Sequence, residues 1–177
     1  MTPEFSRRVS VDQIGAGGHK TGIAADAAEC ALLAKRFGWA RIKSLTANAN
    51  LLARADGVDA LGTLNAVIER ACVASGEPVY ESVEEAFAIH FVPAEADAGA
   101  DAGTDGEFDL NEDDLDVVEF DGAAVDIGEA VAQTLALSVD PFPRSPAAEA
   151  KLRAAGVLAE DEVGSAAFAG LKGLLKG

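Results

Sequence analysis

The sequence predicts an α+β fold: an antiparallel β-meander, strongly curved or barrel-like, with two main helices and a flexible acidic loop. Three observations favour this class. Three long strand-like runs follow one another between residues 39 and 91, stretches near 26–37 and 126–138 carry helix signals, and the stretch 94–114 carries neither. With 177 residues, of which 49% are apolar, the chain suits a single domain with a sizeable core.

The chain begins with two strand-like segments. Residues 4–14 and 19–25 are predicted as strands, and the glycine-rich stretch between them, residues 15–18, is typical of a hairpin turn. These glycines lack the spacing of a phosphate-binding loop, and no helix follows them directly. We therefore expect residues 1–93 to form a β-rich body that starts with this hairpin.

A helix over residues 26–37 is indicated by signals at both ends. Asp26 and Glu29 have the spacing of a capping box. Lys35 and Arg36 stand where the last turn favours positive charge, and Gly38 can adopt the left-handed conformation that ends a helix. The apolar stripe that such a helix buries consists of Cys30, Leu33, Ala34 and Phe37.

Three strand-like runs follow the helix. Residues 39–54 and 58–73 are joined by Ala55-Asp56-Gly57, and Asp-Gly is a strong hairpin signal. The third run alternates with period two, which is typical of a half-buried strand. Its apolar positions are Val79, Val83, Phe87, Ile89 and Phe91, with Glu81 and Glu85 as exceptions on the same parity. Because runs this long exceed the usual length of about 5–6 residues, we expect bends or bulges.

The segment after Pro93 is rich in Ala, Gly and Asp. Such a mixture cannot bury apolar area, so residues 94–114 are predicted to be an acidic, flexible linker. Residues 115–120 can form one more strand. A second helix follows at 126–138, where Asp126 and Glu129 form another possible capping box.

The C-terminal part carries weaker signals. Pro141 and Pro143 end the second helix, and residues 145–177 are predicted to be a weakly helical tail. Within that tail, Gly170 and Gly173 each cost about 1 kcal/mol relative to Ala in a helix. The predicted single domain thus comprises a body (1–93), a linker (94–114), a strand-and-helix segment (115–144) and this tail.

Charge is unevenly distributed along the chain. The net charge is −16, yet no Lys or Arg occurs between Arg70 and Arg144, where 19 Asp and Glu are found. The whole-molecule field therefore repels phosphate, while a local basic face on the first 70 residues remains possible. The N-terminus lacks the apolar region of a signal peptide, and no apolar run reaches the length of a membrane span, so we expect a soluble, cytoplasmic protein.

The sequence indicates no metal, no cofactor and no small-molecule substrate. Cys30 and Cys72 are too few for a zinc site and are predicted to be small buried hydrophobes. The acidic stretch 107–122 begins like a calcium loop, but Asp114 replaces the required Gly and Phe120 replaces the bidentate Glu. The chain shows no recognisable catalytic motif, so we expect a protein that is not an enzyme.

Basic residues of the first 70 positions are the candidate contacts for RNA or a protein partner. If several converge on one side of the sheet, they could hold RNA phosphates or the acidic segment of the chain itself; the alternative is an ordinary solvated face. Trp39 and Tyr80 are interpreted as core or rim residues. The candidate contacts are Arg7, Arg8, Lys20, Arg41, Lys43, Arg54 and Arg70, and the candidate acidic interaction segment contains Asp109, Glu112, Asp113, Asp114 and Asp116.

The most specific stretch is DLDVVEFDGAAVDIGEAVAQTLALSVDPFPRSP. It combines an acidic lead-in, a short strand, a D-[IL]-G-E motif, a helix ending in LAL and a proline-containing turn. This pattern resembles the YceD family, the large ribosomal RNA subunit accumulation proteins, in its alphaproteobacterial form. EFSRRVSVDQIG and ACVASGEPVYESVEEAFAIHFVP agree with it, so the resemblance covers nearly the whole chain and is most specific over 115–144.

The resemblance implies a non-enzymatic cytoplasmic factor needed for normal accumulation of large-subunit rRNA, acting in ribosome assembly or rRNA processing. Some relatives carry Cys-x-x-Cys pairs that look metal-binding, but Cys72 is followed here by Val73, Ala74 and Ser75, and no later cysteine completes a site. A zinc-dependent role is therefore not expected.

Three hypotheses follow for the function. The leading one is association with rRNA or a pre-ribosomal particle, through a local basic face or a ribosomal protein. The second is an acidic interaction module that masks a basic surface by mimicking RNA phosphate. The third, an unrecognised hydrolase, would need His19 or His90 beside Cys30 or Cys72. The sequence leaves the oligomeric state open.

Overall fold

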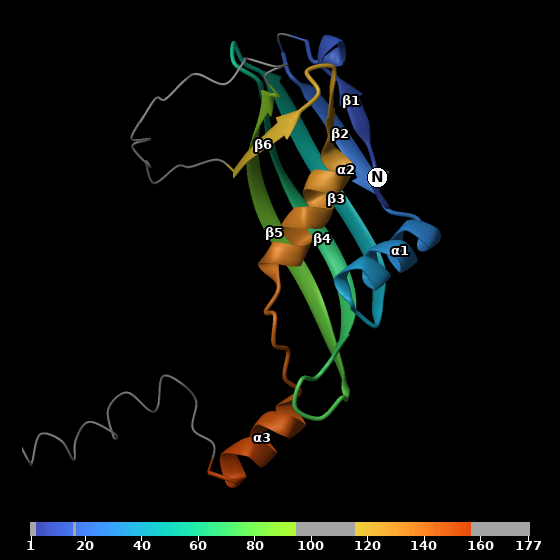
Figure 1. Ribbon diagram of the computed structural model, residues 1–177, viewed down its shortest axis with the longest axis vertical. Helices are drawn as coiled ribbons and strands as arrows, with labels where there is room; N and C mark the ends of the chain where they lie inside the picture. Colours follow the sequence, from blue (N-terminus) through green and yellow to red (C-terminus); the bar gives the residue numbers. More distant parts are fainter. Residues whose placement is uncertain (1–2, 16, 95–115, 157–177) are drawn as a thin grey trace, which may run out of the picture. The chain divides into compact units, whose positions relative to one another are not determined.

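The computed structural model describes residues 3–15, 17–94 and 116–156 (Figure 1). The chain divides into two compact units, Met1–Glu69 with Tyr80–Asp140 and Arg70–Val79 with Pro141–Gly177, and each is described by itself. The elements, in chain order, are β1 (Arg8–Ser10), the 3₁₀ helix η1 (Val11–Gln13), β2 (His19–Ala24), α1 (Ala27–Phe37), β3 (Arg41–Ala53), β4 (Val58–Ala71), β5 (Pro78–Pro93), β6 (Asp116–Phe120), β7 (Ala124–Asp126), α2 (Ile127–Ser138) and α3 (Pro146–Ala154).

The main sheet confirms the α+β class but is mixed. Its strand order is β2-β3-β4-β5-β6; β2 and β4 both run antiparallel to β3, whereas β6 runs parallel to β5. The prediction of a wholly antiparallel meander is therefore wrong at β6. A parallel neighbour needs a long crossover connection, and the chain between β5 and β6 is long enough to supply one. Since β2 and β6 are the two ends of the sheet, the structure does not confirm the barrel-like prediction.

The predicted N-terminal hairpin is also wrong. β1 pairs antiparallel with β7 in a separate two-stranded sheet, with Val9 opposite Val125, while β2 pairs with β3. Val9 and Val125 are both buried, so this pairing removes two apolar side chains from water and stabilises the fold. Turn signals in the local sequence do not reveal a pairing between residues so far apart. Gly18, with φ of 81°, lies on the path from one sheet to the other.

Helix α1 forms as predicted. The Asp26 carboxylate accepts hydrogen bonds from the N–H groups of Ala28 and Glu29, and the Glu29 carboxylate accepts one from Asp26 N–H at 2.8 Å, which completes the capping box. Gly38 ends the helix in the left-handed conformation with φ of 69°.

Helix α2 also forms within the predicted bounds, but its capping box is only half made. Asp126 caps the helix by accepting from the N–H groups of Gly128 and Glu129. The Glu129 side chain does not return to Asp126, because it binds Arg36 of α1 instead. A tertiary ion pair thus replaces a local hydrogen bond at this helix end.

The core of the first unit lies between the main sheet and the two helices, and Figure 1 shows α2 lying across one face of β3, β4 and β5. The expected bulge occurs in β3, between Ile42 and Ser44. The bulge changes which positions of β3 face the core: Ile42 is buried before it, and Leu45 and every second residue up to Leu51 are buried after it. In β5, Phe87, Ile89 and Phe91 are buried and Val83 packs against the core, in agreement with the predicted parity.

The described part of the second unit is built around the β4–β5 connection and the start of α3. Val73 N–H donates to Pro143 O at 2.9 Å, and Ser145 N–H donates to the Cys72 sulfur at 3.2 Å. The Ser145 hydroxyl donates to Glu77 at 2.9 Å and also caps α3, whose first residue is Pro146. Of the predicted weakly helical tail, the described part contains the helix α3 over Pro146–Ala154, and residues 157–177 lie outside the described residues.

Candidate functional site

Arg7 and Arg8, two of the candidate basic residues, each bind a carboxylate of the first unit. The Arg7 guanidinium binds both oxygens of Glu29, at 2.7 and 2.8 Å, and this hydrogen bonding holds the pKa of Glu29 below its ordinary value. Arg8 binds Asp121, whose pKa is lowered first by the N–H groups of Ala124 and Ala123 and then by Arg8. These arginines fasten the N-terminal segment to its neighbours.

Arg54, Arg70 and Lys20 each have different surroundings. Arg54 binds Asp59, which also contacts His90 Nδ1 at 2.6 Å; burial opposes ionisation of Asp59, but these two hydrogen bonds outweigh it and lower its pKa. Arg70 is only 3% exposed and so cannot serve as a surface contact. Lys20 is exposed and lines a shallow depression of about 370 Å³ over β2 and β3.

The last two candidates, Arg41 and Lys43, do come together. They lie at the start of β3 and line a cavity of about 510 Å³ between this strand and α1, joined there by Lys35 from the last turn of α1. We call this cavity the cationic groove. Its full lining is Ala27, Cys30, Ala31, Ala34, Lys35, Trp39, Ala40, Arg41, Ile42 and Lys43.

The shape of the cationic groove follows from the strand register. β2 covers β3 only from Thr46 to Leu51, so the first residues of β3 extend beyond β2 and face α1 across the groove. Alanines line the helix side, which leaves room between the two elements. The three cationic side chains are exposed, and within the described ranges Lys35 and Arg41 form no ion pair.

An aromatic ring lies beside the cations. The Lys43 ammonium is 4.5 Å from the ring centroid of Tyr80, whose residue is 59% exposed. An exposed ring beside positive charge has the composition of a single-stranded nucleic-acid contact, because a base can stack on the ring while the cations hold its phosphate. The exposure of Tyr80 agrees with its prediction as a rim residue, and Trp39 packs against the core as predicted.

Lys35 is the residue that the candidate set lacked. Its place in the last turn of α1 could have predicted that it lies near Arg41 and Lys43. Gly38 reverses the chain after that turn and brings the following strand back toward it. For Tyr80 the sequence offered no such signal, since its approach to Lys43 depends on how β5 is placed beside β4 and β3.

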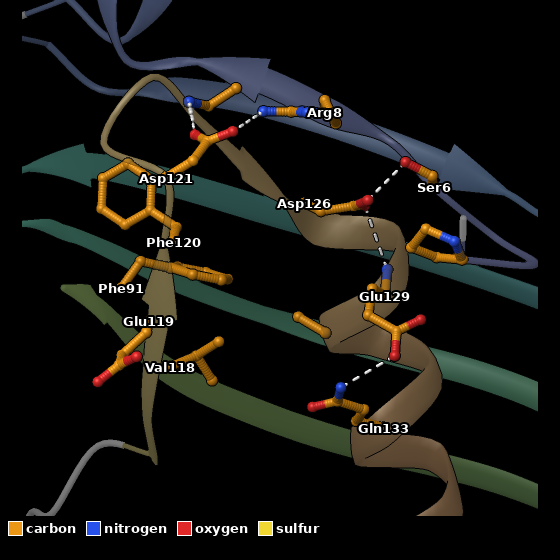
Figure 2. Close-up of a pocket in the computed structure, with 13 residues that line it drawn as sticks. Ser6, Arg8, Phe91, Val118, Glu119, Phe120, Asp121, Asp126, Glu129 and Gln133 are labelled. Atoms are coloured by element: carbon orange, nitrogen blue, oxygen red, sulfur yellow. Dashed lines mark hydrogen bonds and ion pairs between the residues drawn. The ribbon is translucent and has the colours of Figure 1, made fainter. Parts of the chain in front are cut away.

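A second cavity, of about 530 Å³, lies between β6 and α2 (Figure 2). We call it the α2–β6 cavity. Its walls are partly apolar and partly acidic, in contrast to the cationic groove. The lining comprises Pro3, Ser6, Arg8, Phe91, Val118, Glu119, Phe120, Asp121, Ala124, Asp126, Glu129, Ala130 and Gln133.

Two residues of the Asp126-Ile127-Gly128-Glu129 motif, Asp126 and Glu129, line this cavity. Besides capping α2, the Asp126 carboxylate accepts from Arg7 N–H at 2.8 Å and from the Ser6 hydroxyl. Gly128 approaches the same segment so closely that a Cβ on it would lie 2.6 Å from Phe5 O. The first and third residues of the motif thus attach the start of α2 to residues 5–7.

Glu129 attaches the same helix to α1. Its two oxygens bind the Arg36 guanidinium at 2.7 and 2.9 Å, and Arg36 also reaches Glu4 at 3.0 Å. The hydrogen bonds from Arg36 lower the pKa of Glu129 and raise that of Arg36. Ile127 is completely buried, so all four residues of the motif have a structural task.

The remaining predicted features are only partly described. Asp116, exposed at the start of β6, belongs to the candidate acidic segment, while Asp109, Glu112, Asp113 and Asp114 and most of the predicted linker lie outside the described residues. Both cysteines are buried and free, as predicted.

The described contacts contain no cysteine–histidine pair. His90 contacts Asp59 and Asp56, and Cys30 donates to Ala25 O. The Cys72 sulfur accepts hydrogen bonds from Ser75 and from Ser145 N–H, which lower its pKa to about 6. In the same ranges of the chain, no group of three or more His, Cys, Asp or Glu is placed to hold a metal ion.

Comparison with known proteins places these features in a family. The model of one family, described as large ribosomal RNA subunit accumulation protein YceD, matches residues 60–175, which include most of β4, all of β5 and β6, and the motif at the start of α2. No curated protein and no solved structure matches the chain. Among the described helices, none has both the length and the apolar character needed to cross a membrane. Because the match spans more than half of its length, the chain belongs to the YceD family of large ribosomal RNA subunit accumulation proteins.

Proposed function

We propose that this protein is a non-enzymatic, cytoplasmic factor that supports accumulation of large-subunit rRNA by binding RNA of a pre-ribosomal particle at the cationic groove. Family membership supports the link to large-subunit rRNA. The observation that carries the RNA contact is the convergence of Lys35, Arg41 and Lys43 on one cavity beside the exposed ring of Tyr80.

Electrostatics favour a local and selective contact. A net charge of −16 opposes general attraction to RNA, and Arg7, Arg8 and Arg54 are bound to carboxylates of the protein. Lys35 and Arg41 have no such partner in the described residues, so their charge is available to phosphate. Binding through about three phosphate contacts predicts a moderate salt dependence, with a slope of about −2 for a single strand.

The proposal is tested by RNA binding of paired variants. The double variant Arg41→Ala/Lys43→Ala removes two contacts and should reduce the salt slope by about 1.4, because each phosphate contact contributes about 0.7 on a single strand. The matched control Lys20→Ala/Lys151→Ala removes the same charge from exposed positions outside the groove and should leave the slope unchanged. The measurement is fluorescence anisotropy of a labelled oligoribonucleotide of about 12 nucleotides at several salt concentrations.

Two outcomes would contradict the proposal. Equal slopes for the two double variants would show that the groove is not the RNA contact. Deletion of residues 94–114 could instead abolish association with the pre-ribosome while Arg41→Ala/Lys43→Ala leaves that association intact. This pair of results would favour the acidic module that mimics RNA phosphate. A Tyr80→Ala variant adds an independent readout, because loss of one stacked base costs about 1–3 kcal/mol.

A further inference from the structure

The α2–β6 cavity has a strand edge along one wall. β6 is the last strand of the sheet, so one of its edges has no strand partner among the described residues. Phe120 O accepts from Ala94 N–H at 2.8 Å, so Phe120 and Val118 direct their backbone groups toward β5. Because these directions alternate along a strand, the N–H and C=O groups of Val117 and Glu119 point to the free edge. A free edge of this kind accepts an additional strand.

The side chains of β6 separate into two faces. Val118 and Phe120 are half-buried, and the Phe120 ring packs edge-to-face on Phe91 with centroids 6.4 Å apart. Val117 and Glu119 are exposed on the opposite face. A strand added beside β6 would therefore present alternate residues to an apolar surface and the intervening residues to Glu119.

Charge identifies the kind of strand that fits. The residues that line the cavity include four acidic ones (Glu119, Asp121, Asp126 and Glu129) and one basic one, Arg8. Three of these carboxylates already have partners, because Asp121 binds Arg8, Asp126 accepts from Ser6 and Arg7, and Glu129 binds Arg36. Glu119 forms no ion pair with any residue that the structure describes. Glu119 is therefore the carboxylate available to attract Lys or Arg, and its charge repels phosphate.

A second copy of the same strand fits poorly. β6 carries Asp116 and Glu119 within five residues, so pairing of two such strands would bring carboxylates of both copies together. Like charges opposite each other on paired strands are destabilising.

We propose that the α2–β6 cavity binds an extended, basic protein segment, in which apolar residues alternate with Lys or Arg, by addition of that segment as a strand to the free edge of β6. Backbone hydrogen bonds to Val117 and Glu119 supply affinity, and the alternation supplies specificity. The segment matches β6 in length, about five residues. This site is independent of RNA binding at the cationic groove, so either can fail without the other.

The test uses the full chain and a fluorescein-labelled peptide, KVKVKVK, with EVEVEVE and KKKKVVV as comparison peptides. We expect saturable binding of KVKVKVK, at least about tenfold weaker binding of both comparison peptides, and slower amide exchange at Val117 and Glu119 on addition of KVKVKVK. Glu119→Lys should weaken KVKVKVK binding at least about tenfold, whereas the matched variant Glu85→Lys, with the same charge change on an exposed position of β5, should not.

A further variant separates strand addition from simple charge attraction. Val117→Pro removes an N–H that faces the free edge and is not used in pairing with β5, so the fold should persist while the peptide loses a backbone partner. Four results would overturn the proposal: no saturable binding of KVKVKVK, equal binding of EVEVEVE, equal loss in Glu119→Lys and Glu85→Lys, or amide protection at Val117 by an oligoribonucleotide instead of the peptide. A concentration-dependent dimer abolished by Glu119→Lys would identify a second copy as the occupant and also overturn it.

Discussion

Asp126 should contribute more to the free energy of unfolding than a helix cap alone. Asp26 provides the matched comparison, because both aspartates cap a helix of the first unit by accepting from two backbone N–H groups. Only Asp126 also accepts from Arg7 N–H and the Ser6 hydroxyl. The variants Asp26→Ala and Asp126→Ala remove one negative charge each, so their difference isolates these two tertiary hydrogen bonds.

The expected magnitudes follow from the bonds lost. Loss of an Asp cap costs about 1 kcal/mol, which is the expected effect of Asp26→Ala. Hydrogen bonds to a charged group contribute about 1.5–3 kcal/mol each, so at the lower end Asp126→Ala should cost about 3 kcal/mol more, or about 4 kcal/mol in total. With a urea m-value of about 2 kcal/mol/M, the unfolding midpoint should fall by about 0.5 M in Asp26→Ala and about 2 M in Asp126→Ala.

Trp39 makes this measurement specific to the first unit. It is the only tryptophan of the chain and packs against the core of that unit, so its fluorescence during urea unfolding reports the relevant transition. Equal midpoints for the two variants would contradict this prediction, because they would show that the bonds to residues 6 and 7 contribute no net stability.

Three further predictions concern other contacts of these units. Because Arg36 lowers the pKa of Glu129, this ion pair stabilises the fold in full above the ordinary pKa of 4.5 and stabilises it less as pH falls below that value. The difference in unfolding free energy between wild type and Arg36→Gln, measured by urea unfolding at a series of pH values, should therefore shrink as pH falls. A constant difference would contradict the ion pair. Gly128→Ala places a Cβ against backbone atoms and should cost about 1–3 kcal/mol, whereas Gly17→Ala, with open space around it, should not destabilise; equal urea midpoints would contradict this. The thiol of Cys72, with a pKa of about 6, should react with iodoacetamide faster than that of Cys30, whose pKa is raised by burial. The variant Ser75→Ala should slow the reaction of Cys72 at neutral pH. Peptide mapping of the labelled protein measures both rates, and equal rates for Cys72 with and without Ser75 would argue against the hydrogen bond between them.

Local signals predicted the elements better than their partners. The bounds of α1 followed from Asp26, Glu29 and Gly38, which act within a few residues of one another, and the β3–β4 hairpin followed from Asp56-Gly57. The direction of β6 and the pairing of β1 with β7 could not be predicted in the same way. Each depends on residues more than 20 positions apart, and nothing in the alternation of a strand identifies its neighbour.

The candidate contacts show the same limit. Sequence locates every Arg and Lys but does not show which of them meets a carboxylate of the same chain, and Arg7, Arg8 and Arg54 all do. Arg41 and Lys43 were predictable as neighbours on one strand. Their grouping with Lys35 and Tyr80 required the turn after α1 and the placement of β5 in the sheet.

The proposed function requires contact between the cationic groove and large-subunit rRNA in the cell. Ultraviolet cross-linking of growing cells that express the full chain, followed by mass spectrometry of RNA-linked peptides, measures this contact. We predict links to large-subunit rRNA at Lys35 to Lys43 and at Tyr80, and their loss in Arg41→Ala/Lys43→Ala. Links confined to other parts of the chain, or unchanged in that variant, would contradict the proposed function.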